Sequence, residues 1–185
     1  MATRSTWRRQ LVRRVLHGVD TWYRRKYRLQ PMGPVLWVGC IAYKGATRVF
    51  ADGTQLLPTQ TVGELHFDNA RIAGLGAETR QHAGIRFARL FRESLRQLAR
   101  HTQADPMLAD VAVYHGITWF KTHGIKVGFV SEPMPPGLRR WWCATYLRWL
   151  WRGFTPVPSR RGERLHPRAF WITRQDLIKY FGDRR

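Results

Sequence analysis

Residues 61–101 read TVGELHFDNARIAGLGAETRQHAGIRFARLFRESLRQLARH, and this stretch decides the predicted fold. Polar and apolar types alternate toward Phe67, which is the period of a half-buried strand. From Thr79 to His101, apolar residues recur every three or four positions and arginines take the opposite face. That pattern predicts a long amphipathic helix. We therefore expect a sheet strand followed by a helix that packs against the sheet.

The rest of the chain predicts shorter elements around this pair. Its 185 residues fit one domain. We predict a single α+β domain over 1–185, with a small mixed sheet packed against the long helix and a Trp-rich helix. A basic amphipathic helix is expected within 1–28 and a mobile basic loop at 156–168. The further predicted strands span 35–43, 48–50, 111–114, 129–130 and 169–172, and the further helices span 7–27, 118–127, 138–154 and 173–182.

Charge is the most unusual property of the composition. The formal net charge is +20, and the chain contains nine tryptophans. Such a chain favours anionic partners, either nucleic acid or an anionic membrane surface, although a merely soluble basic surface is an equal alternative. No apolar run approaches the ~20 residues of a membrane span. Cys40 and Cys143 lie in apolar surroundings, so we expect both to be free buried thiols. We therefore expect a cytoplasmic protein, either free or at the inner face of the membrane.

Glu64, His66 and Asp68 are the first candidate catalytic residues. Since alternate side chains of a strand share a face, these three should lie on one side, with Leu65 and Phe67 buried on the other. Two carboxylates and an imidazole on one face suit general acid–base catalysis or metal binding. An ordinary half-exposed strand whose polar groups pair with arginines is the alternative, and we favour it. We predict no metal site.

His115 is the fourth candidate catalytic residue. It follows the predicted strand Val111–Tyr114, and binding residues often gather at strand ends. A histidine bonded by the backbone at a tight turn is the alternative that we favour. We expect His66 and His115 both to lie at strand ends, and only for this reason is their pairing worth testing.

Gly76 and Gly84 flank the start of the long helix and are candidate ligand-binding positions. The first N–H groups of a helix can hold a pyrophosphate. The segment 81–86 (QHAGIR) resembles the phosphate-binding loop of acetyl-CoA-dependent N-acetyltransferases (the GNAT family), and this resemblance implies acyl-CoA as an alternative cofactor. Arg86 stands where that loop has a small residue, and a plain helix start is the other interpretation.

The segment 138–154 mixes tryptophan with arginine. Such helices lie at anionic membrane interfaces or bind nucleic acid, but we favour a core helix whose tryptophans pack under the sheet. The arginines of this helix and of the N-terminal helix are the candidate membrane or polyanion surface. They are Arg9, Arg13, Arg14, Arg148 and Arg152.

Several segments together resemble the YkoP-like bacterial domain family. They are 52–53 (DG), 64–69 (ELHFDN), the long helix, 114–118 (YHGIT) with 128–129 (GF), and 171–177 (WITRQDL). Among them, Asn69, Tyr114 and Thr118 are candidate ligand-binding residues. The resemblance implies a domain found alone or fused to polysaccharide deacetylases, and hence a link to cell-envelope glycans or to a polysaccharide-modifying enzyme as partner.

These observations leave three functions open. The first is a non-enzymatic accessory or binding module of cell-envelope polysaccharide metabolism, peripheral to the membrane and without a cofactor. The second is a GNAT-like acyltransferase, and the third is a nucleic-acid-binding protein. An acyltransferase needs a splayed gap between two parallel strands at the start of the long helix. A nucleic-acid binder needs its arginines in one groove or stripe, and a membrane module needs exposed tryptophans at one edge.

Overall fold

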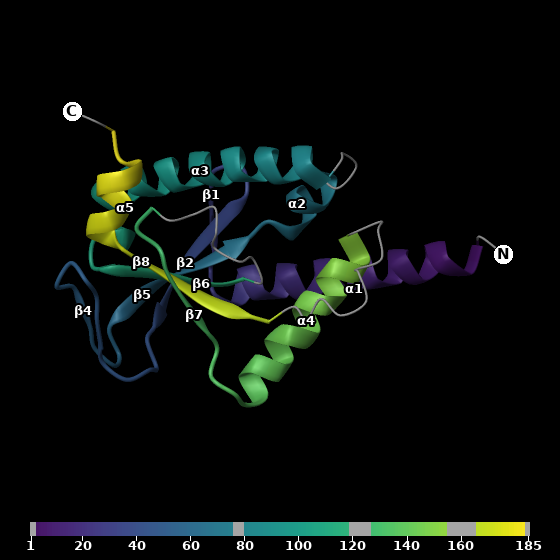
Figure 1. Cartoon of the computed structure of the whole chain (residues 1–185), viewed down its shortest axis with the longest axis horizontal. Helices are drawn as coiled ribbons and strands as arrows, with labels where there is room; N and C mark the ends of the chain where they lie inside the picture. Colours follow the sequence, from purple (N-terminus) through teal and green to yellow (C-terminus); the bar gives the residue numbers. More distant parts are fainter. Residues whose placement is uncertain (1–2, 76–79, 119–126, 155–165, 184–185) are drawn as a thin grey trace.

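The computed structural model describes residues 3–75, 80–118, 127–154 and 166–183 (Figure 1). The helices are α1 (Thr3–Lys26), α2 (Asn69–Leu75), α3 (Arg80–Ala104), α4 (Leu138–Phe154) and α5 (Arg174–Phe181), with a 3-10 turn at Pro106–Leu108. The strands are β1 (Gln30–Met32), β2 (Leu36–Ala42), β3 (Arg48–Val49), β4 (Gln55–Leu56), β5 (Thr61–Phe67), β6 (Val113–Thr118), β7 (Val130–Pro133) and β8 (Arg168–Thr173).

Six of these strands form one mixed sheet in the order β1-β2-β5-β6-β8-β7. The neighbours β5 and β6 are parallel, and the other described neighbours are antiparallel. The long helix α3 lies in the connection between the two parallel strands, as a parallel pair requires. The remaining strands, β3 and β4, pair in a separate hairpin. The chain is therefore an α+β domain with a mixed sheet, as the sequence predicted.

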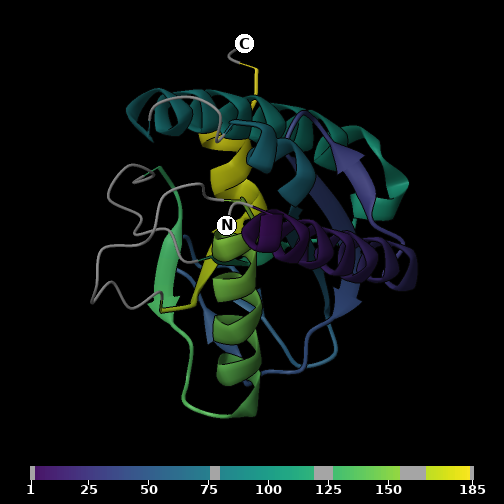
Figure 2. The same cartoon turned by 90° about the vertical axis from the view of Figure 1, so that its right-hand side faces the viewer.

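One face of the sheet packs against α3 and α5, which lie together on one side in Figures 1 and 2. Leu65 of β5 is 4% exposed and belongs to the same apolar cluster as Phe91 and Leu95 of α3. The ring of Phe67 lies 5.4 Å from that of Phe91. The alternation of β5 thus buries Leu65 and directs Phe67 to the core, while its polar residues face the other side.

The other face is covered in two parts. At one end, Val62 and Trp171 form a smaller cluster with Leu56 of the β3–β4 hairpin. At the other end, α1 and α4 contact each other and lie over the sheet (Figure 2). The polar residues of β5 point into this second region. We call α1 and α4 the cover helices, because they determine what surrounds these polar residues.

Several predicted boundaries were wrong. The strand β6 runs from Val113 to Thr118 rather than over 111–114, so His115 is inside a strand and not after one. The strand β7 runs from Val130 to Pro133 rather than over 129–130. The sequence prediction also missed β1, β4 and α2. Pro31 lies within β1, and among the described strands β1 pairs with β2 alone, so this edge strand tolerates a missing N–H.

The Trp-rich helix α4 has the predicted bounds but not the predicted burial. Trp141, Trp142 and Trp149 are 59%, 62% and 46% exposed, so the interpretation as a core helix is wrong. Cys40 and Cys143 are free, as expected, but only half-buried. The predicted mobile loop at 156–168 lies largely outside the described residues, and its last residue, Arg168, belongs to β8 and bonds Ser131.

Candidate functional site

A groove of about 670 Å³ lies between α1, α4 and the face of β5 and β6. That volume is within the range of small-molecule sites. Its walls are mainly apolar, and its polar groups come from α1, α4, the strand ends and the start of α2. The lining residues used below are Val15, Val19, Asp20 and Tyr23 of α1, Glu64 and His66 of β5, Asn69, Thr118, and Trp141, Trp142, Cys143, Thr145, Tyr146 and Trp149 of α4.

Glu64 and His66 reach the groove because they occupy alternate positions of β5. Tyr23 of α1 lies over both. Its hydroxyl donates a hydrogen bond to Glu64, and its ring stacks on His66 at 5.1 Å between centroids. Burial, followed by the neighbouring charge of Glu64, raises the pKa of Tyr23 far above its ordinary value. Tyr23 therefore stays a hydrogen-bond donor at physiological pH.

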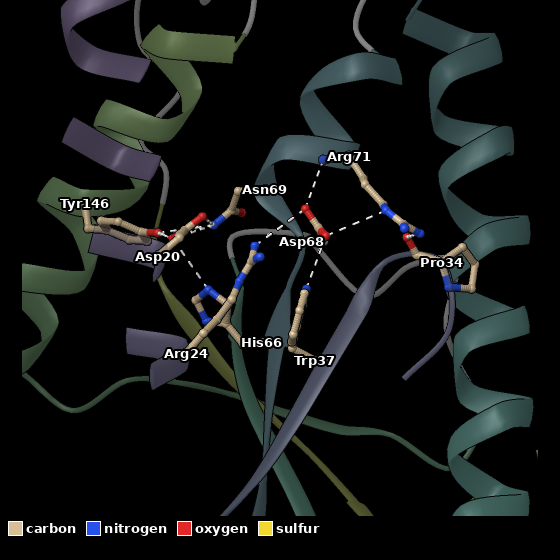
Figure 3. A network of polar contacts seen from close by, with 9 residues as sticks. All are labelled: Asp20, Arg24, Pro34, Trp37, His66, Asp68, Asn69, Arg71 and Tyr146. Atoms are coloured by element: carbon tan, nitrogen blue, oxygen red, sulfur yellow. Dashed lines mark hydrogen bonds and ion pairs between the residues drawn. The ribbon is translucent and has the colours of Figure 1, made fainter. Parts of the chain in front are cut away.

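Asp20 is the centre of a buried polar cluster that joins α1, α4 and β5 (Figure 3). It is 4% exposed and accepts hydrogen bonds from the hydroxyl of Tyr146 and from the amide of Asn69, the latter at 3.0 and 3.2 Å. Nε2 of His66 lies 3.6 Å from Oδ1 of Asp20, an ion-pair distance when the ring is protonated. We call Asp20, His66, Asn69 and Tyr146 the Asp20 cluster.

The environment keeps Asp20 ionised. Burial acts to raise the pKa of Asp20, but the contacts from His66, Tyr146 and Asn69 outweigh it, and the pKa is lowered. Burial and the adjacent Asp20 carboxylate raise the pKa of Tyr146, so its proton remains available for donation. The Asp20 cluster is therefore a fixed anion whose donors come from three different elements.

Asp68 does not join this cluster, although it was predicted on the same strand face. It follows the end of β5, and its carboxylate accepts a hydrogen bond from the backbone N–H of Arg71 in the first turn of α2. It also accepts one from Nε1 of Trp37 at 3.2 Å and lies 3.6 Å from Arg24 (Figure 3). Asp68 is a helix cap within an arginine network, and it lies outside the groove lining.

His115 is also separate from the groove. It is opposite Glu64 in the β5–β6 register, but it is 6% exposed and packs against the ring of Trp171 at 4.3 Å. Burial, followed by the charges of Arg139 and Arg48, lowers its pKa to about 4. Its Nδ1 has no hydrogen-bond partner in the described structure. His66 lines the groove and His115 does not, so the structure does not bring the two together in one site.

The predicted ligand-binding residues fall into three groups. Asn69 and Thr118 line the groove. Tyr114 does not, because its side chain lies on the α3 face of the sheet, where its hydroxyl is within hydrogen-bond distance of Thr102. Gly76 lies outside the described residues, and Gly84 is an exposed position inside α3 with open space around it.

Of the predicted basic surface, Arg14 on α1 and Arg148 on α4 are exposed. Arg9, Arg13 and Arg152 belong to the same two helices, but their side chains lie outside the described part of the chain. All five predicted arginines therefore belong to α1 and α4, the two helices that border the groove.

Three groove residues that sequence reasoning missed are Asp20, Tyr23 and Tyr146. Tyr23 follows Trp22 and Tyr146 precedes Leu147 in predicted amphipathic helices, so neither stands out from an apolar face. Asp20 carried a clearer signal, since it is the only acidic residue in the first 51 and falls beside the apolar face of α1. A carboxylate at such a position needs partners, because burying an unpaired charge is costly.

The sheet divides at the bottom of the groove. β5 and β6 pair at three positions, which end at Leu65 and Gly116, although both strands continue beyond them. Among the described residues, His66 and Phe67 pair with β2 alone, and Ile117 and Thr118 pair with β8 alone. The two parallel strands therefore separate beside the groove.

The arrangement suits the binding of a ligand with an apolar body and hydrogen-bonding groups. Glu64 and His66 are at the sheet, and indole rings form the outer wall. Cys143 also lines the groove, but burial raises the pKa of its thiol, which disfavours a nucleophilic thiolate. Among the described residues, no group of three or more His, Cys, Asp or Glu side chains is placed to hold a metal ion.

None of the described helices has the length and apolar character needed to cross a bilayer. Comparison with curated proteins gave no match, and comparison with solved structures gave none. The family described as the YkoP domain matches residues 9–181, which include most of α1, the whole sheet and α4. The chain belongs to the YkoP domain family.

Proposed function

We propose that the protein is a non-enzymatic binding module of cell-envelope polysaccharide metabolism, and that the groove between α1 and α4 holds its ligand. The ligand is an amphiphile with an apolar body and hydroxyl groups, as in a saccharide carried on a lipid. The module acts in the cytoplasm at the inner face of the membrane, with a polysaccharide-modifying enzyme as its partner.

The groove is the observation that carries this proposal. Its apolar walls suit a hydrocarbon body, and burying such a body is favourable in proportion to its area. Glu64 accepts one hydrogen bond from Tyr23 and has a second carboxylate oxygen for a ligand hydroxyl. Indole rings such as Trp141 and Trp142 can stack on the apolar face of a sugar ring. The link to envelope glycans comes from the resemblance of the domain to those fused to polysaccharide deacetylases.

A binding role fits the state of the Asp20 cluster better than catalysis does. The Asp20 carboxylate is occupied by Asn69 and Tyr146, and its lowered pKa makes it a poor acceptor for a ligand proton. Fixed polar groups in an apolar groove provide orientation and specificity for a bound ligand.

Octyl glucoside, used below its micelle-forming concentration, is a suitable probe because it combines an alkyl chain with a sugar. We expect it to raise the melting temperature of the full chain saturably, by the equivalent of about 2.7 kcal/mol at a hundredfold excess over its dissociation constant. Glucose alone should have little effect, since it lacks the apolar body.

A groove-filling variant provides the control. Thr145→Trp adds an indole to the lining and should abolish the stabilisation, whereas Ile85→Trp adds one to an exposed position of α3 and should not. Equal stabilisation of both variants, or none of the wild type, would contradict the groove as the ligand site.

A second candidate function is acyl transfer, and the divergence of β5 and β6 favours it. An acyltransferase of the GNAT family, which segment 81–86 resembles, requires a gap between two parallel strands at the start of the long helix. Against it, Gly84 lies inside α3, which begins at Arg80, so the N–H of Gly84 is not among the first free donors of the helix.

Acetyl-CoA distinguishes the two functions. The binding-module proposal expects no melting-temperature shift with coenzyme A or acetyl-CoA. A clear upward shift that Gly84→Glu abolishes would instead make the protein an acyl-CoA-binding enzyme. A Cβ added at Gly84 would meet no other atom within 4 Å, so the substitution should not disturb the fold by itself.

A further inference from the structure

The exposed face of α4 carries a continuous apolar stripe. Leu138, Trp141, Trp142 and Trp149 are 73%, 59%, 62% and 46% exposed. Their spacing of three, four and eleven residues from Leu138 places all four on one side of a helix, because each residue turns the helix by about 100°. We call these four residues the tryptophan stripe.

Arginines flank the tryptophan stripe. Arg139 and Arg148 are exposed and fall on opposite sides of the stripe around the helix. In Figure 2, α4 lies in front of the sheet with α1 beside it, and the molecule places no other described helix over it. Large apolar rings exposed between cations are unfavourable in water and are typical of an interface with anionic lipid.

We propose that the tryptophan stripe is the surface by which the protein docks onto an anionic lipid bilayer. Indole rings favour the headgroup region of a bilayer, and each nearby arginine adds attraction to anionic lipid. A second copy of the chain is a poorer occupant, because two molecules of formal charge +20 repel each other.

This surface also explains the position of the groove. Trp141, Trp142 and Trp149 line the groove as well as the outer surface, so the mouth of the groove faces the bilayer. An amphiphile can then pass from the membrane into the groove without crossing water. The inference rests on the proposed location at the membrane, but it does not depend on which ligand the groove takes.

Cosedimentation of the full chain with vesicles tests the inference. We compare vesicles of phosphatidylcholine with vesicles that also contain about 30% phosphatidylglycerol, and we expect binding only to the anionic vesicles, weakening as salt rises. Leu138 does not line the groove, so Leu138→Glu should reduce vesicle binding without changing the response to octyl glucoside. Ile85→Glu, at 58% exposure on α3, is the matched control and should bind normally.

A matched pair of charge variants separates docking by α4 from the effect of net charge. Replacing Arg139 and Arg148 by glutamine should weaken binding by about thirtyfold, from ~1 kcal/mol for each arginine near the surface. Replacing Arg89 and Arg92 of α3 by glutamine removes the same charge from exposed positions on the other side of the sheet and should have a much smaller effect. Quenching of tryptophan fluorescence by brominated lipid should occur for wild type and be lost in Leu138→Glu.

The inference is overturned by equal binding to neutral and anionic vesicles, by no binding to either, or by equal losses in the two charge pairs. It is also overturned if Leu138→Glu instead abolishes a dimer or binding to nucleic acid while leaving vesicle binding unchanged. Absence of vesicle binding together with normal stabilisation by octyl glucoside would refute the docking surface and leave the groove proposal standing. Normal vesicle binding without stabilisation by octyl glucoside would refute the groove proposal and leave the docking surface standing.

Discussion

Replacing Asp20 by alanine should destabilise the protein more than any other single change to a carboxylate in the groove. Asp20 is 4% exposed and joins α1 to α4 through Tyr146 and to the start of α2 through Asn69. Alanine removes the acceptor from the buried amide of Asn69 and from the partly buried hydroxyl of Tyr146. The cover helices lose their shared polar contact as a result.

The magnitude follows from the contacts that are lost. A hydrogen bond to a charged group contributes about 1.5–3 kcal/mol, and two donor groups lose such a bond. Asn69 and Tyr146 also contact each other at 3.2 Å, so they can satisfy each other in part. We therefore expect a loss of about 3 kcal/mol in the free energy of unfolding, near the lower end of the range for breaking a buried charged pair.

Urea denaturation followed by circular dichroism measures this loss, and its pH dependence tests the cause. The pKa of Asp20 is lowered in the folded protein, so its contribution is complete above the unfolded value of about 3.9 and disappears as the pH falls through the folded value. The difference between wild type and Asp20→Ala should therefore be constant from about pH 7 to pH 5 and shrink below about pH 4.

Two comparisons make the reasoning refutable. Asp110 is exposed, and Asp110→Ala should change stability by less than about 0.5 kcal/mol. A double-mutant cycle between Asp20→Ala and Tyr146→Phe should give a coupling of about 1 kcal/mol or more. A loss for Asp20→Ala no larger than that for Asp110→Ala, or a coupling near zero, would show that the Asp20 cluster does not hold the helices.

Three further predictions concern other parts of the molecule. The pKa of His115 is lowered to about 4, so its contribution to stability is complete above the unfolded value of about 6.5 and is lost as the pH falls toward 4. His115→Leu should therefore flatten that part of the curve of stability against pH. Gly84→Ala should raise stability by about 0.5–1 kcal/mol in thermal denaturation, because the position is helical and its surroundings are open. Gly116→Ala should lower it by about 1–3 kcal/mol, because the new Cβ would lie 2.4 Å from Cζ of Phe170 and 2.9 Å from the carbonyl oxygen of Leu65.

The spacing of apolar residues correctly predicted those helices and strands whose buried side chains recur with the period of the element. The bounds of β5 and α4 agree with the prediction, and α1, α3 and α5 differ by a few residues at their ends. The closing helix begins where its capping residues indicate, since the side chain of Thr173 accepts a hydrogen bond from the backbone N–H of Asp176. Alternation also placed Leu65 in the core and Glu64 and His66 on the opposite face.

The errors arise where contacts between distant segments decide the outcome. β1 is a strand because it pairs with β2, and its three residues carry too little pattern to show this alone. The tryptophans of α4 recur with a helical period, but this period does not show whether their side of the helix packs against the sheet or faces a lipid surface. Asp20 joins the site only because α1 crosses α4 near Tyr146, a contact between residues 126 positions apart.

The two halves of the molecule have different roles for a physical reason. On the α3 side, the cluster around Leu95 and Leu98 is fully buried, and aromatic and aliphatic side chains fill the space between helix and sheet. On the α1 and α4 side, the polar residues of β5 prevent such packing, because an apolar helix laid directly on Glu64 and His66 would bury their polar groups without partners. At the edge of α1, Tyr23 instead donates a hydrogen bond to Glu64, and the Asp20 carboxylate lies 3.6 Å from Nε2 of His66, while a groove remains above the sheet. The same polar strand that makes this side a poor core therefore leaves the groove in which we propose that the ligand binds, next to the exposed rings of α4 that we propose to dock on a membrane.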